Sequence, residues 1–289
     1  MRKLQKVGPH EWRFRWPQDF YDEALIMDDA IELAAQGDEG EAERRLRAVL
    51  ERSPEHIDIM QALAQVLNHT DRKEQAGTLW RKAVDLGRSA FPPRAFKVGR
   101  DLLEWDWLEN RPFLRCLRGL MYHSHFDLGE TNKALDLAYE LLALNPRDNQ
   151  GVRASAMSWL LAAGRDVEAV ELAERYPDDF FPETTYGRAL ALYRLGRTPE
   201  ADSTLKAAID NLPAVTAELL RDTHRAPSNA HSGYESIGGT DQAYNYWEVD
   251  GQLWEGSGDA LDWLRRIQSE VSTVDDFHAT VRRGSRRRP

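Results

Sequence analysis

The sequence contains one cysteine, Cys116, among 289 residues. A single cysteine cannot form an intramolecular disulfide or supply a cysteine-rich zinc site. No apolar run approaches the ~20 residues that span a bilayer, and the N-terminus lacks the apolar run of a secretory signal. These absences exclude a disulfide-stapled scaffold and predict a cytoplasmic protein that does not bind a membrane.

Motifs that carry catalysis are also lacking. The sequence has no Gly-rich phosphate loop, no His-Glu-x-x-His helix and no Gly-x-Ser-x-Gly elbow. Its one close histidine pair, His123 and His125, is two residues apart, so on a helix the two rings point to different faces. We therefore expect no metal, no cofactor and no enzymatic activity.

One arrangement leaves an enzymatic alternative open. Cys116 lies seven residues before His123, a spacing that puts both on one helix face. The alternative hypothesis is an enzyme or small-molecule sensor that uses this face. The structural interpretation is a buried thiol on a packed helix, because cysteine often behaves as a small hydrophobic residue.

The net charge of -10 is unevenly distributed. Residues 1–16 are basic, and residues 282–289 contain five arginines and no acid. The body between them is strongly acidic and repels nucleic acid at long range. A nucleic-acid partner is therefore not expected, although contact through the basic termini remains a second alternative.

A repeat runs through most of the chain. A turn residue is followed five positions later by alanine, four further on by an apolar or small residue, and eight further on by proline. Complete copies begin at Gly37, Gly129 and Gly196, and partial copies begin at Asp71 and Gly164. The repeated alanines are Ala42, Ala76, Ala134, Ala169 and Ala201. Most of their intervals lie close to 34 residues, the period of the tetratricopeptide repeat (TPR).

Each part of this pattern suits a pair of antiparallel helices. The turn residue follows the first helix, where a left-handed backbone is needed. The alanine lets the helices cross closely, and the proline ends the second helix. The longest interval, between Ala76 and Ala134, leaves room for one extra helix, which we place around residues 94–107. No segment shows a period of two, so strands are not expected.

Over residues 22–213 the chain resembles the TPR superfamily, although the aromatic and glycine signature of the first helix is mostly missing. The run at residues 144–153 is also similar to the TPR-like suppressor-of-tumorigenicity proteins. The resemblance implies an all-α fold, an α-solenoid of TPR-like helical hairpins with helical caps. It does not specify an activity.

The predicted organisation has four parts. An aromatic and basic arm, residues 1–21, packs along the first hairpin, and the repeat array occupies residues 22–213. A C-terminal helical cap spans residues 214–281 and contains helices at 241–254 and 259–271. Residues 282–289 form a basic tail.

In TPR arrays the first helix of each hairpin lines the concave face. Counting back from each turn predicts a polar and aromatic groove that contains Gln61, Gln65, His123, Phe126, Ser158 and Tyr186. Its expected rim comprises Arg111, Arg115, Arg118 and Arg153. The predicted function is a non-enzymatic scaffold that binds a peptide or helix of a partner protein in this groove. The partner and the oligomeric state do not follow from the sequence.

Overall fold

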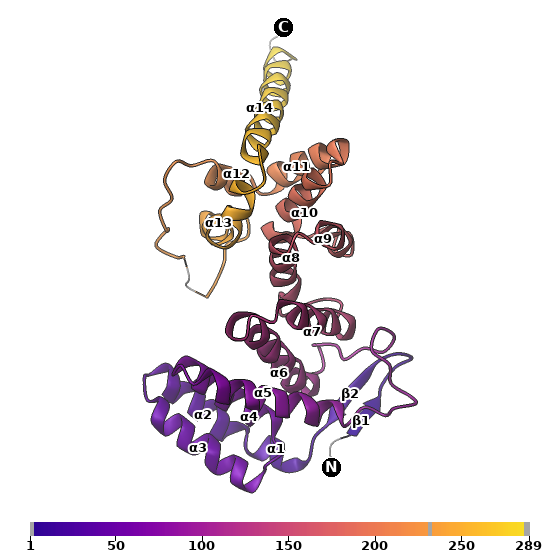
Figure 1. Ribbon diagram of the computed structural model, residues 1–289, viewed down its shortest axis with the longest axis vertical. Coiled ribbons are helices and arrows are strands. Elements are labelled where there is room, and N and C mark those ends of the chain that lie inside the picture. Colours follow the sequence, from indigo (N-terminus) through magenta and orange to yellow (C-terminus); the bar gives the residue numbers. More distant parts are fainter. Residues whose placement is uncertain (1–2, 231–232, 286–289) are drawn as a thin grey trace. The chain divides into compact units, whose positions relative to one another are not determined.

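The computed structural model describes residues 3–230 and 233–285 (Figure 1). Helices account for 66% of the chain. The fold divides into two compact units, unit 1 (residues 1–152) and unit 2 (residues 153–289), each described here by itself.

Unit 1 contains three helical hairpins, α2–α3, α4–α5 and α6–α7, in which each helix packs against the next. Its helices are α1 (Gln18–Asp22), α2 (Ala24–Ala35), α3 (Glu39–Arg52), α4 (Ile57–His69), α5 (Lys73–Arg88), α6 (Arg111–Tyr122) and α7 (Thr131–Leu144). A 3₁₀ turn, η1 (Leu108–Asn110), precedes α6, and a π-helical turn, η2 (His123–Asp127), follows it.

Unit 2 contains two further hairpins, α8–α9 and α10–α11, followed by three helices. Its helices are α8 (Val152–Ala162), α9 (Asp166–Glu174), α10 (Pro182–Arg194), α11 (Thr198–Asn211), α12 (Pro213–Leu219), α13 (Thr240–Glu255) and α14 (Ala260–Ser285). Helix α13 packs against α10 and α12. The two helices predicted in the C-terminal cap therefore exist as α13 and α14.

All five predicted turn residues adopt a left-handed backbone. Gly37, Asp71, Gly129, Gly164 and Gly196 have φ values between 59° and 88°. Each follows the first helix of a hairpin, where reversal of the chain requires this conformation.

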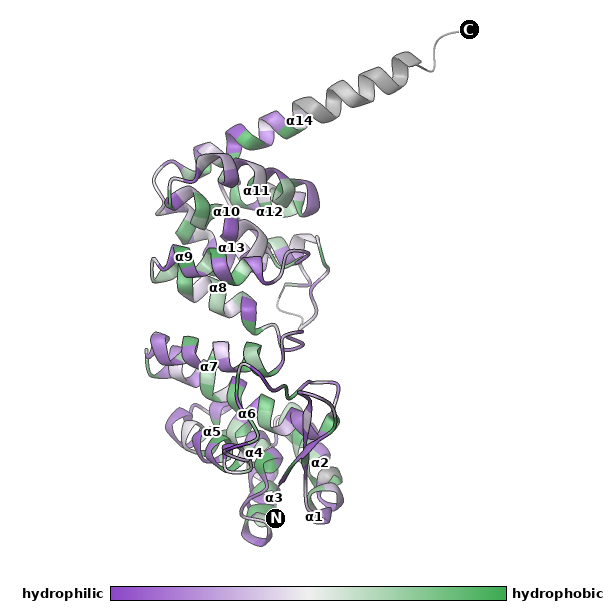
Figure 2. Cartoon of the chain, turned by 90° about the vertical axis from the view of Figure 1, so that its right-hand side faces the viewer, coloured by the Kyte–Doolittle hydropathy of each residue, from purple (hydrophilic) through white to green (hydrophobic). Residues whose placement is uncertain are grey.

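The repeated alanines are all fully buried, with no exposed surface: Ala42, Ala76, Ala134, Ala169 and Ala201. They lie near the starts of the second helices of the hairpins, as the close-crossing argument requires. Figure 2 shows hydrophobic and hydrophilic residues sharing the same helices, as amphipathic packing demands. The predicted fold class is confirmed within each unit.

The prediction that strands would be absent is wrong. Strands β1 (Lys3–Lys6) and β2 (Trp12–Arg15) pair antiparallel, with Leu4 opposite Phe14. In β2, Trp12 and Phe14 are buried, while the intervening Arg13 is partly exposed. This alternation is a period of two, within the segment that was predicted to be an aromatic and basic arm without strands.

The β1–β2 hairpin contacts parts of unit 1 other than the first helical hairpin, along which the arm was predicted to pack. The ring of Phe14 lies 5.4 Å from that of Phe113 on α6, and Nε1 of Trp12 donates to Asp101 at 3.2 Å. The following segment reaches the residue before α4, because the ring of Phe20 stacks on that of His56 with the centroids 3.7 Å apart. The arm therefore covers several elements of unit 1.

The extra helix expected around residues 94–107 is also absent, because turns and bends occupy this segment. The carboxylate of Asp101 accepts a hydrogen bond from the backbone N–H of Lys97 at 2.8 Å. The N–H of Leu102 donates to His10, and that of Leu103 donates to Leu144. These side-chain and long-range contacts replace the local bonds of a helix. Among the described residues, no helix is long and apolar enough to cross a membrane.

Candidate protein-binding groove

An open groove of about 600 Å³ lies over the first helices of the three hairpins in unit 1. Helix α4 contributes Asp58, Gln61, Ala62, Gln65 and Asn68, and α6 contributes Arg115, Arg118, Gly119 and Tyr122. Helix α2 adds Met27, Asp28 and Ile31, and other segments add Trp80, Trp105, Asn149 and Gln150. The groove is thus rich in amide and aromatic side chains.

The floor of the groove is formed by Trp80 of α5, which is 5% exposed. Its Nε1 donates to Oε1 of Gln61 at 2.6 Å. Gly119 leaves room for the indole, because a Cβ at position 119 would lie 2.4 Å from Nε1 of Trp80. The lack of a side chain at Gly119 therefore lets α6 approach this floor closely.

One side of the groove carries a charged and aromatic cluster. Arg115 lies 3.6 Å from the carboxylate of Asp58, and burial raises the pKa of Asp58 despite the nearby guanidinium. The guanidinium groups of Arg111 and Arg115 lie 5.0 and 5.7 Å from the ring centroid of Trp105. These contacts hold the arginines by cation–π attraction and orient their free N–H groups.

Whereas Arg115 lies beside Asp58, Arg118 has no acidic partner among the described residues. Its guanidinium lies 5.1 Å from the ring centroid of Tyr122, and its side chain is exposed. A guanidinium presents several N–H donors in a fixed planar arrangement that suits a carboxylate. Arg118 is therefore an available anion-binding group inside the groove.

A smaller apolar recess of about 170 Å³ adjoins the groove between α2 and α4. Ile31, which is 45% exposed, lines both hollows together with Ala62 and Gln65. Leu25 on the same helix is 75% exposed. Exposed apolar side chains beside a hollow are typical of an interaction surface.

Four predicted residues come together in this groove: Gln61, Gln65, Arg115 and Arg118. Phe126 is 69% exposed and its ring lies 5.9 Å from that of Tyr122, so it flanks the groove without lining it. Arg111 lies behind Trp105, to whose carbonyl oxygen its Nε donates at 3.0 Å.

His123 is a core residue and not the accessible groove residue predicted from the sequence. It is 4% exposed, and its Nδ1 lies 2.8 Å from Asp127. Its Nε2 faces Gly77 of α5, where an added Cβ would lie only 2.0 Å away. The π-helical turn η2, which the repeat pattern did not predict, contains this residue.

Cys116 and His123 do not act as a pair. The thiol of Cys116 donates to the carbonyl oxygen of Ile57 at 3.4 Å, whereas His123 bonds Asp127. Burial raises the pKa of Cys116 well above its ordinary value, and the charge of Asp58 adds to this effect. A thiol that stays protonated is a poor nucleophile. The enzymatic alternative on this face therefore lacks a reactive group.

Ser158 and Tyr186 lie on the predicted face, but α13 covers them. Ser158 of α8 donates to Oδ2 of Asp250 at 2.8 Å. Tyr186 of α10 has no exposed surface, and its ring lies 6.2 and 6.3 Å from the rings of Tyr246 and Trp254. The repeat pattern contained no information on which segment would cover this face.

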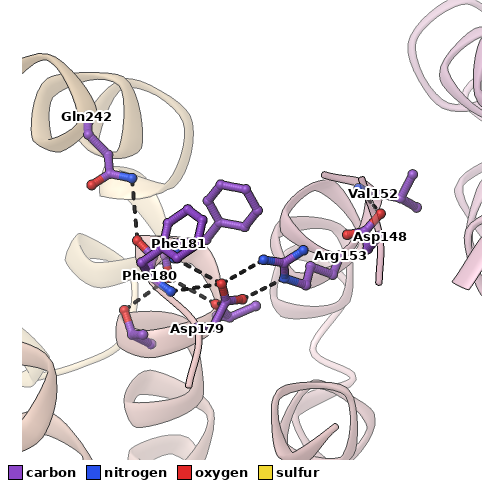
Figure 3. A network of polar contacts seen from close by, with 9 residues as sticks. Asp148, Val152, Arg153, Asp179, Phe180, Phe181 and Gln242 are labelled. Carbon is purple, nitrogen blue, oxygen red and sulfur yellow. Dashed lines mark hydrogen bonds and ion pairs between the residues drawn. The ribbon is translucent and has the colours of Figure 1, made fainter. Parts of the chain in front are cut away.

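Arg153 is a structural residue and not an exposed rim residue. Its Nε and Nη2 atoms both donate to Asp179 at 2.7 Å, and its guanidinium lies 4.4 Å from the ring centroid of Phe181 (Figure 3). Burial acts to raise the pKa of Asp179, but hydrogen bonds from Arg153 and Thr184 hold it below its ordinary value. This buried pair fixes the start of α10 against α8.

The hairpin stacks, left-handed turns and buried alanines define a helical repeat protein of the TPR-like class. The sequence profile of a family described as transcriptional repressor TCF25 matches residues 39–279. Because this match covers most of the chain, the protein belongs to that family. No curated protein sequence matches the chain.

Among solved structures, the chain is similar to YrrB, described as a TPR protein with an unusual peptide-binding site. The identity is 16%, the TM-score is 0.47, and the match covers 65% of this chain and 85% of that chain. The similarity of residues 144–153 to suppressor-of-tumorigenicity proteins stays a prediction. In the structure this run begins at the end of α7 and forms the connection to α8.

Several groove residues were not predicted from the sequence. Asp58 and Tyr122 occupy the same helix faces as Gln61 and Arg118, so a wider count at helical spacing would have found them. Trp105 comes from the irregular segment that was expected to be a helix. No repeat pattern places such a residue.

Proposed function

We propose that the groove of unit 1 binds a peptide or helix of a partner protein, and that the protein acts as a non-enzymatic scaffold. One observation carries this proposal. We call the surface formed by the first helices of the hairpins the first-helix face. In unit 2 this face, formed by α8 and α10, is covered by α13, whereas in unit 1 the face formed by α2, α4 and α6 carries an open groove.

The way α13 packs in unit 2 favours a helix as the ligand of the groove in unit 1. Helix α13 places Tyr246, Asp250 and Trp254 at four-residue spacing on the face that contacts α8 and α10. The same chain thus shows that a first-helix face of this repeat accepts a helix through aromatic anchors and one polar contact. Helices laid into grooves commonly bind through residues spaced in this way.

The residues that line the groove of unit 1 indicate which chemical groups the partner presents. An apolar side chain fits the recess beside Ile31, and an acidic side chain pairs with Arg118. The amide groups of Gln65 and Asn68 can donate to and accept from polar side chains or exposed backbone. We therefore propose an amphipathic segment with at least one acidic residue.

The family description concerns transcriptional repression. A scaffold that holds another protein fits such a role without catalysis, and we propose it for this chain on that basis. The cytoplasmic location expected from the sequence stays a prediction, which imaging of the tagged protein would test.

Contact with nucleic acid through the basic termini is the competing hypothesis. Residues 282–285 of the expected tail form the end of α14, while residues 1–2 and 286–289 lie outside the described residues, so the basic tail stays a prediction. Binding by such a tail would weaken steeply as salt rises, because phosphate contacts release counterions. Binding in the groove would depend much less on salt.

A photo-crosslinking amino acid at Gln65 tests the groove directly. We expect it to capture a defined segment of a partner protein, and we expect Arg118→Ala to reduce that capture. The same probe at Lys82, which lies on the second helix α5 and does not line the groove, should not capture that segment. Equal capture from both positions would contradict the proposal.

The captured segment, made as a peptide, then gives a quantitative test. Because interface arginines often dominate binding energy, Arg118→Ala should raise the Kd about tenfold or more. The exposed Arg81 on α5 provides a matched control, and Arg81→Ala should leave the Kd unchanged. Equal losses in the two variants would place the site outside the groove.

A further inference from the structure

The first-helix face of unit 2 is covered by a helix that comes later in the chain. Helix α13 packs against α10 and α12, and its Asp250 accepts a hydrogen bond from Ser158 of α8. Residues 220–239 connect α12 to α13. The helix thus occupies the position that a bound partner helix takes in a groove of this kind.

Helices α10 and α13, which meet at this contact, each carry a carboxyl group with buried oxygen atoms. Asp250 is 2% exposed and receives its hydrogen bond from Ser158 at 2.8 Å. Glu183, at the start of α10, buries its Oε2 atom, which has no hydrogen-bond partner among the described residues. A buried carboxyl oxygen without a partner destabilises the contact when it carries charge.

Both groups hold protons more tightly than exposed carboxyls do. Burial, together with the charges of Asp250, Glu235 and Asp179, raises the pKa of Glu183 to about 7, against the opposing effect of a backbone hydrogen bond. Burial raises the pKa of Asp250 to about 6, against the opposing effect of the Ser158 hydrogen bond.

Other charged groups near α13 already have partners. On α10, Arg194 donates to the backbone of Leu253 and pairs with Asp166. On α12, Glu218 pairs with His224 and Arg221.

The remaining charged groups near this contact also have partners. Asp179 is held by Arg153 of α8, and Glu235 accepts from Asn245 of α13. On α14, Arg265 pairs with Asp262 in the same helix. No basic group among the described residues compensates Glu183 or Asp250.

We propose that α13 is a releasable cover over a second helix-binding surface, held closed while Glu183 and Asp250 retain protons and loosened when both are ionised. The surface consists of α8, α10 and α12. Its ligand in the open state is an amphipathic helix with aromatic residues at the spacing of Tyr246 and Trp254 and, at the position of Asp250, a basic residue that pairs with ionised Glu183.

The direction of the pH effect follows from the raised pKa values. A carboxyl that binds its proton more tightly in the closed state stabilises closure at low pH. That stabilisation is complete below the ordinary carboxyl pKa values of 3.8 and 4.5, and it is lost progressively as pH rises toward about 6 for Asp250 and about 7 for Glu183. Ionised carboxylates at this contact then repel each other, and α13 opens.

Hydrogen exchange of the full chain at pH 5.5 and pH 8, corrected for the intrinsic exchange rate, tests the cover. Protection of the α13 amides should fall at least tenfold between the two pH values, while protection of α4 in unit 1 changes less. Glu183→Gln and Asp250→Asn should each reduce this fall. The exposed Glu255 supplies a matched control on the same helix, and Glu255→Gln should behave like the wild type.

Constant protection of α13 across this range would overturn the proposal, as would an unchanged pH dependence in Glu183→Gln. Circular dichroism of each variant checks that it is folded. If one substitution unfolds unit 2, the other still decides the question.

A synthetic peptide with the sequence of residues 240–255 and the substitution Asp250→Lys, which removes the carboxylate that ionised Glu183 repels, tests the surface itself. It should bind the full chain at pH 8 and bind at least tenfold more weakly at pH 5.5. Arg118→Ala should leave this binding unchanged, which separates the surface of unit 2 from the groove of unit 1. Absence of binding at pH 8 would show that the covered face is not a ligand site.

Discussion

Tyr186 shows how a single side chain joins neighbouring elements of unit 2. Its hydroxyl donates to the carbonyl oxygen of Leu212 at 2.8 Å and lies 2.8 Å from Oγ1 of Thr216. The ring is fully buried beneath α13. Its contribution is therefore to stability, and it cannot contact a partner while α13 is in place.

Tyr186→Phe should lower the free energy of unfolding by about 1–2 kcal/mol, because buried groups lose a hydrogen-bond partner. Urea denaturation measures the change. Tyr21 is 51% exposed, so Tyr21→Phe should have little effect. Tyr186→Phe should also leave binding at the unit 1 groove unchanged. Equal stability of Tyr186→Phe and the wild type would contradict this assignment.

Two glycines in helices should respond oppositely to alanine. Gly40 in α3 has open space where a Cβ would be added, whereas a Cβ at Gly119 in α6 would meet the indole of Trp80 at 2.4 Å. Gly40→Ala should raise the free energy of unfolding by about 0.5–1 kcal/mol through reduced backbone entropy. Gly119→Ala should lower it by about 1–3 kcal/mol through overpacking. Thermal unfolding measures both, and the same sign for both would show that the groove floor is not tightly packed.

At the scale of helices, the alanine five residues after each turn residue makes the close helix contact that defines its hairpin. Ala201 in α11 has no exposed surface, while Ala207 on the same helix is exposed. Ala201→Leu should therefore lower the free energy of unfolding by about 1–3 kcal/mol, because the crossing helices must move apart. Ala207→Leu should change it much less. Similar melting temperatures for the two variants would mean that the hairpin register is wrong.

The same scale explains what could be predicted from the sequence. A glycine or aspartate after each first helix and an alanine five residues later are local requirements of a hairpin, so both features were predicted. The short strand containing Trp12 and Phe14 was missed because its partner strand is short and its buried faces depend on distant rings such as Phe113. The groove residue Trp105 was missed for a similar reason, because contacts far along the chain hold its segment in place.

At the scale of the whole molecule, only part of the groove could be predicted. Spacing along a helix identifies a face, so Gln61 and Gln65 were found. It does not show that α13 covers Ser158 and Tyr186, because that depends on a helix more than fifty residues further along the chain. The distinction between an open face in unit 1 and a covered face in unit 2 therefore required the structure.

The acidic body and basic tail give the two binding hypotheses different salt dependences. A partner helix held in the groove by apolar contacts and Arg118 should bind with modest salt dependence. A nucleic acid held by the tail should lose affinity steeply as salt rises.

The most direct measurement is a titration of the crosslinked partner peptide into three forms of the full chain at two salt concentrations. The forms are the wild type, Arg118→Ala and a chain lacking residues 282–289. The account predicts about tenfold weaker binding or more for Arg118→Ala, no change on removal of the tail, and a modest salt effect. Loss of binding only on removal of the tail would contradict it.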